Sequence, residues 1–410
     1  MNRIDKLARQ CTLSLLIIYE RMSMNYYIKK ICLMSLVLGK GIQGYTYDKH
    51  LYDNHIVHVV ILDPHEYSAH YVKAHDAVFG RETVKQMAER SGATVAINGG
   101  FFEVGATQDG MPSGTSIEEN IIFGLTLSEH DCLVWDKNGE LSIERISPTV
   151  VAIADDVAVS VTSVNQYIQE NETVLYTSGW GKNTLTPYEG RVEVSFDSDF
   201  QLEYVRKHGN NDIPEGGYVL SFPAENGLNL ENLKLLITTT RGKSVSSALK
   251  GIPMLVQNGK ILDRVVNNKA TGHTLPYART ALGIKKDGTI VIVATEPFSS
   301  IDPKGMTLSD LKNVLMSKGE EFAQSLNKKM WEFTLFDLKN MLKKEYTSRG
   351  REIVGLTMVE LAQFMIDQGC YSAINLGGGA TTTIWIEGQD TLNEKAAKTA
   401  VADAIVFCKK

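Results

Sequence analysis

The chain has 410 residues, 43% of them hydrophobic, which is enough for one large domain or two average ones with a real core. It contains 42 Lys and Arg residues against 48 Asp and Glu residues, and its formal net charge is −6. This composition excludes disordered and fibrous proteins. It also offers no basic field for nucleic acid, so a nucleic-acid partner is not expected.

The N-terminal stretch resembles a secretory signal peptide in its layout. After Met24, Lys29 and Lys30 precede the apolar run 31–38, and glycines follow up to residue 44. A short basic region, a short apolar segment and a small-residue exit are typical of such a leader, and the apolar run is too short to span a bilayer comfortably. The alternative is an amphipathic or buried N-terminal segment.

We therefore expect residues 1–45 to be a leader, with Met24 as the true start, and residues 50–410 to be a single functional domain. The predicted location is secreted or in the cell envelope, with no stable membrane span once the leader is removed. The five cysteines are widely spaced and indicate neither a disulfide framework nor a zinc site.

Helices and strands alternate in the first part of the domain. Residues 55–63 read as a strand, residues 80–92 as a helix with Gly92 just past its end, and residues 93–98 as a buried strand. Residues 120–300 are mainly strand, and an Asp287-Gly288 turn between two β-branched runs predicts a hairpin.

Residues 305–370 read mainly as helix. Thr307 with Asp310, and Thr357 with Glu360, have the spacing of capping boxes that begin helices. We therefore predict an α/β fold of mixed α+β type: one large sheet-rich domain with flanking helices and an inserted helical excursion near 305–355.

A helix, a buried strand, Ala-Ile-Asn and then glycines occur twice. The first copy ends at Asn98 and the second at Asn375. If the two strand ends are neighbours, their loops could expose N–H groups to a ligand. The alternative is two tight turns in which Asn and Gly supply positive φ.

The histidines do not have the spacing of a metal site. Six of the nine lie between His50 and His75, but His65 and His70 are five residues apart rather than the four that place two ligands on one helix face. We therefore expect no bound metal and no cofactor.

Four charged residues near these turns are candidates for chemistry. Arg279 lies at the start of a strand, where its planar fork could bind a phosphate. Glu103, Asp109 and Glu296 are the carboxylates closest to the suspected turns, and carboxylates serve as acids, bases or nucleophiles in glycoside and phosphodiester chemistry.

The order of several segments resembles the phosphodiester glycosidase family. They include AINGGFF at 96–102, IPMLVQNGKIL at 252–262, ARTALGI at 278–284, AINLGGGATTT at 373–383 and AVADAIVF at 400–407. The resemblance implies an α/β hydrolase that cuts a sugar phosphodiester at the anomeric carbon of the sugar. It also implies a substrate that is a sugar phosphodiester or a phosphoglycan.

The resemblance implies roles for particular positions. Arg279 would hold the phosphate, and the glycine N–H groups and threonine hydroxyls would line the same pocket. By their position near the turns, Glu103 or Glu296 is our candidate for the catalytic carboxylate. The matched binding positions are Asn98, Gly99, Gly100, Phe102, Arg279, Thr280, Asn375, Gly378, Gly379, Thr382 and Thr383.

One departure from the family pattern concerns catalysis. The family usually has Asp where this chain has Gly377. Two hypotheses follow: a hydrolase of sugar phosphodiesters, or a catalytically weakened or inactive protein on the same fold that binds carbohydrate or phosphoglycan.

Overall fold

The computed structural model describes residues 44–295 and 355–410, except 53–54, 156, 170, 225–229, 239–244 and 390–397. The chain from Tyr45 to Lys410 forms one compact unit. Residues 1–43 of the predicted leader, residues 305–354 of the predicted helical excursion with its Thr307–Asp310 capping box, and Glu296 lie outside the described residues, and β1 begins at the last residue of the predicted leader, Tyr45.

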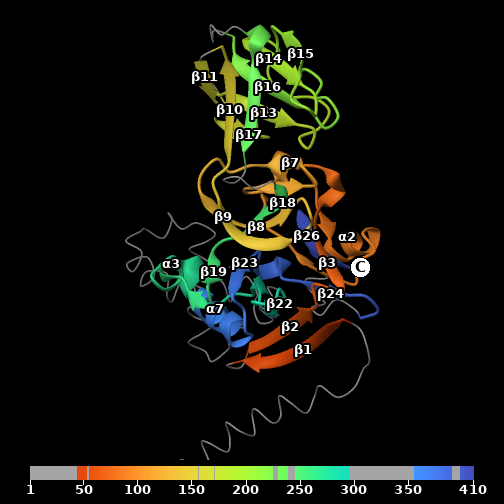
Figure 1. Cartoon of the computed structure of the whole chain (residues 1–410), viewed down its shortest axis with the longest axis vertical. Coiled ribbons are helices and arrows are strands. Elements are labelled where there is room, and N and C mark those ends of the chain that lie inside the picture. Colours follow the sequence, from red (N-terminus) through yellow and green to blue (C-terminus); the bar gives the residue numbers. More distant parts are fainter. Residues whose placement is uncertain are drawn as a thin grey trace, which may run out of the picture. The chain divides into compact units, whose positions relative to one another are not determined.

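A seven-stranded antiparallel sheet joins the first two strands of the domain to strands from its second half. Figure 1 shows β2 beside β22, although the colour bar separates them widely in sequence. The predicted hairpin at Asp287-Gly288 is confirmed, because it joins β21 to β22 and Gly288 has a φ of 87°. In sheet order the strands are β1 (Tyr45–Tyr52), β2 (His55–Leu62), β22 (Ile290–Thr295), β21 (Thr280–Ile284), β23 (Ser372–Asn375), β19 (Met254–Gln257) and β20 (Lys260–Ile261).

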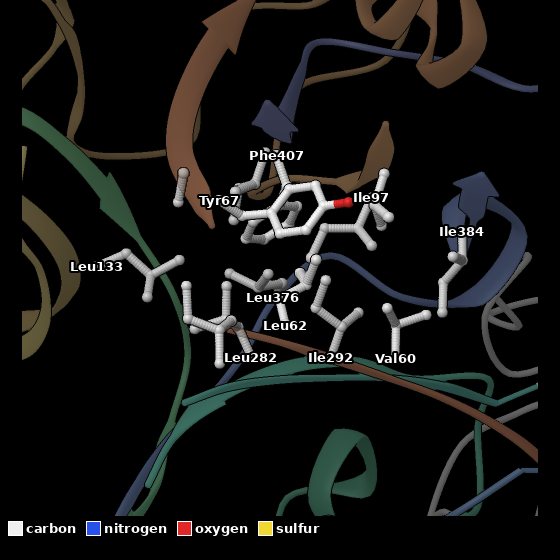
Figure 2. Packing of buried hydrophobic residues seen from close by; sticks show 14 of the residues in the cluster. Val60, Leu62, Tyr67, Ile97, Leu133, Leu282, Ile292, Leu376, Ile384 and Phe407 are labelled. Atoms are coloured by element: carbon white, nitrogen blue, oxygen red, sulfur yellow. The ribbon is translucent and has the colours of Figure 1, made fainter. Parts of the chain in front are cut away.

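A four-stranded sheet packs against this large sheet through a shared apolar core. Figure 2 shows Phe407, Tyr67 and Ile97 of the smaller sheet facing Leu62 and Ile292 of the larger one. These side chains are almost completely buried, so the two sheets form a sandwich. The smaller sheet has the order β24 (Ile384–Ile386), β5 (Val95–Asn98), β26 (Asp403–Lys409) and β3 (Tyr67–Lys73).

One helix covers the outer face of each sheet in this sandwich. Helix α2 (Val84–Arg90) packs Met87 and Ala88 against the four-stranded sheet, and helix α7 (Met358–Asp367) packs Leu361 and Met365 against the seven-stranded sheet. Both begin with complete capping boxes, at Thr83 and at Thr357. Each helix leads into a buried strand that ends in asparagine, as the sequence predicts.

The middle of the chain adds further sheets with cores of their own. A five-stranded sheet contributes Leu133, Trp135 and Leu249 to the sandwich core. Its order is β7 (Ile121–Gly124), β6 (Ser116–Glu118), β18 (Val245–Lys250), β8 (His130–Asp136) and β9 (Leu141–Ile146). A second five-stranded sheet has the order β12 (Ser163–Val164), β13 (Val174–Thr177), β16 (Tyr218–Pro223), β14 (Arg191–Phe196) and β15 (Leu202–Arg206).

Small elements complete the described structure. The remaining strands are β11 (Val157–Ser160), β10 (Thr149–Ala154) and β17 (Lys234–Thr238) in one sheet, and β25 (Ala400–Val401) with β4 (Glu82–Thr83) in another. The remaining helices are α3 (Asp263–Val266) and α4 (Thr271–Thr274), with 3-10 turns η1 (Ala74–Asp76), η2 (Ala106–Gln108), η3 (Leu230–Asn232) and η6 (Gly379–Thr381).

The prediction of an α/β fold with flanking helices is wrong. The described residues contain 26 strands and four α-helices. Every strand pairing among them is antiparallel except β12 with β13. Most neighbouring strands are joined without a helix between them, so the molecule is built from antiparallel sheets rather than from repeated helix–strand units.

Candidate functional site

The two Asn-Gly loops meet although they follow strands of different sheets. Asn98 ends β5, and its Nδ2 donates to the Gly377 carbonyl over 2.8 Å. Its Oδ1 accepts from Thr280 Oγ1 at 2.7 Å and from the Thr383 amide at 3.0 Å. The Gly377 amide donates to the Gly99 carbonyl at 2.9 Å. Asn98 is therefore a buried clasp between the sheets, with its side chain bonded to protein.

The glycines after Asn375 are explained by backbone contact. A Cβ on Gly377 would lie 2.7 Å from the Gly100 carbonyl oxygen, and one on Gly378 would lie 2.7 Å from the Ala278 carbonyl oxygen. Gly379 has open space around it but a φ of 70°, which an L side chain rarely adopts. Gly377 and Gly378 are thus needed for close approach, and Gly379 for its conformation.

Asn375 connects the second loop to β19. Its Nδ2 donates to the Ile252 carbonyl at 2.6 Å and to the Leu376 carbonyl at 2.9 Å. Its buried Oδ1 has no hydrogen-bond partner among the described residues.

Arg279 is buried at the start of β21, where it binds backbone carbonyls. Its Nε donates to the Leu356 carbonyl at 3.0 Å, and one Nη donates to the Gly272 and Leu275 carbonyls at 2.7 and 3.1 Å. Burial lowers the pKa of Arg279 to about 10, against the opposing effect of Tyr277, so the side chain stays charged near neutral pH. The guanidinium therefore ties together the segments before β21 and before α7.

The remaining predicted binding residues surround the clasp. Thr280 and Thr382 are buried, and Thr383 is buried with its amide on Asn98. Phe102 is partly buried and pairs its backbone with Pro112. Among these matched positions, Thr280 and Thr383 bond to the Asn98 side chain directly.

Glu103 lies on a hairpin-like excursion that we call the 101–113 loop. The Ser113 amide donates to the Phe101 carbonyl at 2.9 Å, and the Glu103 amide donates to the Met111 carbonyl at 2.8 Å, which pairs the two arms. Asp109 closes the tip by accepting from the Gly105 amide at 2.7 Å and from Arg81 Nε at 2.8 Å. These two hydrogen bonds, the amide first, hold the pKa of Asp109 below its usual value.

The Glu103 carboxylate lines a cleft of about 320 Å³. Oε1 of Glu103 accepts from Ser113 Oγ at 2.9 Å, which orients an otherwise exposed side chain. A volume of this size suits a small sugar ligand. The lining residues are Glu103, Gln108, Met111, Pro112, Ser113, Gly114, Leu125, Thr126 and Gln166.

A much smaller cavity adjoins the cleft, and the two share Pro112, Ser113 and Gly114. Its volume of about 10 Å³ leaves room for no more than about one water molecule. Its lining includes one carboxylate, Asp403, and one ammonium, Lys250.

Sequence reasoning missed a buried charged group beneath the 101–113 loop. Asp403 accepts from the Gly100 amide at 2.7 Å and from Tyr71 Oη at 3.1 Å. Lys73 lies directly across from Asp403 on the neighbouring strand, and its Nζ donates to the Gly110 and Ala402 carbonyls at 3.2 and 2.9 Å. These residues hold both ends of the loop that carries Glu103.

Burial dominates the electrostatics of this group. It lowers the pKa of Lys73 to about 8 despite the attraction of Asp403, Glu118 and Glu82, and it raises the pKa of Asp403 despite Lys73. Burial also raises the pKa of Glu118 to about 7. The one signal in the sequence was Asp403 itself, an acid directly before the apolar run 404–408.

Among the described residues, no three or more His, Cys, Asp or Glu side chains are grouped so that they could hold a metal ion. No helix in the same ranges is long and apolar enough to cross a membrane.

The sequence of this chain matches the model of a known protein family. A family model described as phosphodiester glycosidase matches residues 148–327 and 346–408. An uncharacterized protein of Rickettsia conorii is 32% identical over 294 residues, which cover 68% of this chain and 99% of that protein.

Two solved structures resemble the fold. A hypothetical protein from Synechocystis has a TM-score of 0.63 at 16% identity, over 90% of this chain and 62% of that one. A Burkholderia pseudomallei protein, named as a candidate exported protein, has a TM-score of 0.57 at 17% identity, over 86% of this chain and 74% of that one. At these identities the likeness concerns the fold alone, and this chain spans less than two thirds of the Synechocystis protein.

Proposed function

Because this chain belongs to the phosphodiester glycosidase family, we propose that it is a hydrolase that releases a sugar from a sugar 1-phosphodiester. The observation that carries the proposal is the Glu103 cleft. There a carboxylate oriented by Ser113 shares a sugar-sized space with the amides of Gln108 and Gln166. Carboxylates with neighbouring amides and hydroxyls are the usual means of binding and cleaving a sugar.

The proposed step uses Glu103 as a general base. A water molecule gives a proton to the Glu103 carboxylate while its oxygen attacks the anomeric carbon. The bond from that carbon to the phosphate oxygen breaks, and the electron pair leaves with the phosphate. The products are a free sugar and a phosphomonoester.

The leaving group explains how the reaction could proceed without the family carboxylate that Gly377 replaces. A departing phosphomonoester dianion has a conjugate acid with a pKa of about 6, far below that of an alcohol. It can leave without a proton from a general acid, so one carboxylate acting as base is sufficient for the proposed step. Glu296, outside the described residues, stays a second candidate for this role.

The test is release of free sugar from a panel of sugar 1-phosphodiesters by the purified chain. Glu103→Gln should reduce the rate by about 10² to 10⁴, the usual effect of removing a general base. Glu140→Gln, at an exposed turn, is the matched control and should leave the rate unchanged. A folded wild-type protein with no turnover on the whole panel would overturn the proposal.

The second candidate is a protein that binds carbohydrate or phosphoglycan without cleaving it. The observation in its favour is Gly377, where the family carboxylate is replaced by a backbone contact with Gly100. Saturable binding of a sugar 1-phosphate, together with no sugar release from any phosphodiester, would favour this candidate over the hydrolase.

We also propose that the protein is exported. The support is the leader-like sequence from Met24 and the name of the Burkholderia structural relative. Fusing residues 24–45 to a reporter enzyme that is active only outside the cytoplasm should yield activity. Lys29→Glu combined with Lys30→Glu should reduce it, and a fusion that stays inactive and uncleaved would contradict export.

A further inference from the structure

Lys250 lies at the junction of the two cavities. It ends β18, and its backbone amide donates to the Thr115 carbonyl at 2.8 Å. Its side chain crosses Gly114 so closely that a Cβ there would lie 2.2 Å from Lys250 Cδ and 3.2 Å from Nζ. The glycine at position 114 therefore lets the Lys250 side chain pass from the small cavity to Thr126, a residue that lines the Glu103 cleft.

The Lys250 ammonium retains capacity to bind an anion. Its Nζ donates to Thr126 Oγ1 at 3.3 Å, and Thr126 lines the same cleft as Glu103. Among the residues that the structure describes, Nζ makes this one side-chain hydrogen bond and no ion pair within 4.0 Å. An ammonium has three donors, so two remain for a ligand.

The other buried or half-buried cations near the loops are already engaged, including Arg81, which pairs with Asp109. Arg279 binds three backbone carbonyls and is not among the residues that line either cavity. Lys73 is fully buried, bonded to two carbonyls and opposite Asp403. Lys250 is the cation of this group that lines a cavity.

We propose that Lys250 and the Thr126 hydroxyl form the site that binds the phosphate group of the substrate. This inference rests on the proposed function for the identity of the ligand, a sugar phosphodiester. Two adjacent residues connect this site to Glu103, because Gly114 lies against the Lys250 side chain and Ser113 bonds to the Glu103 carboxylate. A phosphate at Lys250 directs the attached sugar along Pro112–Gly114 toward the Glu103 carboxylate.

Binding of inorganic phosphate and of glucose 1-phosphate to the full chain tests this site without requiring turnover. Isothermal titration calorimetry should show that Lys250→Met weakens both by about 10- to 100-fold, the usual effect of losing a charge-assisted hydrogen bond. Lys250→Arg should retain most of the affinity. Lys260→Met, which removes an exposed lysine on β20, is the matched control and should bind like the wild type.

The inference is overturned if the wild type does not bind phosphate, or if Lys250→Met binds phosphate as tightly as the wild type. It is also overturned if Arg279→Met is folded and yet does not bind phosphate. If Lys250→Met does not fold, acetylation of Lys250 in the wild type, followed by mass spectrometry, should be slowed by phosphate; no protection would also overturn it.

The outcome separates this site from the hydrolase proposal. If phosphate binding depends on Lys250 but no sugar is released, the anion site is supported and the hydrolase proposal is contradicted. If sugar is released and its KM is unchanged in Lys250→Met, the hydrolase proposal is supported and the anion site is contradicted.

Discussion

Replacing Gly377 by alanine tests whether the two Asn-Gly loops are held together as the structure shows. The added Cβ would lie 2.7 Å from the Gly100 carbonyl oxygen, 3.1 Å from that of Gly99 and 3.2 Å from Asn98 Nδ2. Two of these neighbours are backbone atoms, which cannot move aside as a side chain can. The loops must therefore separate.

The cost has two parts. Overpacking of a tight contact costs about 1–3 kcal/mol. Separation also strains the hydrogen bonds from the Gly377 amide to Gly99 and from Asn98 to the Gly377 carbonyl, each worth about 1 kcal/mol. We expect the free energy of unfolding to fall by about 2–4 kcal/mol in Gly377→Ala.

Urea unfolding followed by fluorescence measures this change. Gly272→Ala is the matched control, because its Cβ meets open space in helix α4 and should leave stability equal or slightly higher. Gly377→Asp should be at least as destabilised as Gly377→Ala, and it should not raise sugar release. A Gly377→Ala protein as stable as wild type would refute the close packing of the loops.

Three further predictions concern buried polar groups. Burial raises the pKa of Glu118 from 4.5 to about 7, so its contribution to stability is present below pH 4.5 and is lost as the pH rises to 7, by about 3 kcal/mol. In urea unfolding, Glu118→Gln should therefore weaken the dependence of the unfolding free energy on pH between 4.5 and 7. The same pH dependence in Glu118→Gln and wild type would contradict this. Asp403→Ala should cost about 3–5 kcal/mol because it removes the largest carboxylate attraction on the buried Lys73 cation and the acceptor of the Gly100 amide, and Asp403→Asn should cost less. Equal losses would argue against a role for the charge. Asn98→Ala should cost about 2–4 kcal/mol by leaving Thr280 and the Thr383 amide without their acceptor, and thermal unfolding indistinguishable from wild type would exclude the clasp.

Local elements could be predicted from the sequence because short-range signals determine them. The hairpin at Asp287-Gly288, the helix that ends before Gly92 and the capping box at Thr357 all depend on residues within a few positions of one another. These features need no knowledge of the tertiary fold.

Tertiary relations could not be predicted from local pattern. The sequence left open whether Asn98 and Asn375 end neighbouring strands or close two separate turns. In the structure β5 and β23 belong to two facing sheets, and Asn98 at the end of β5 bonds the loop after β23. The pairing of Lys73 with Asp403 depends on the register of β3 and β26, at opposite ends of the domain sequence. Two alternating helix–strand segments suggested an α/β fold, whereas the pairing between strands is almost entirely antiparallel.

The site residues divide in the same way. Glu103 was selected for its position after a Gly-rich turn, and the structure adds the Ser113 hydrogen bond and the cleft. Arg279 was selected for the chemistry of its side chain, but the carbonyls that engage it come from residues whose proximity no motif reveals. Its predicted contact with phosphate stays a prediction.

We propose that the chain cleaves the bond between the anomeric carbon and the phosphate oxygen, with Glu103 as base. Hydrolysis of a sugar 1-phosphodiester in water enriched in oxygen-18, followed by mass spectrometry of the phosphomonoester product, tests this step. Attack at the anomeric carbon gives a phosphomonoester without the label, and the rate should collapse in Glu103→Gln. Label in the phosphomonoester, or an undiminished rate in Glu103→Gln, would rule the step out.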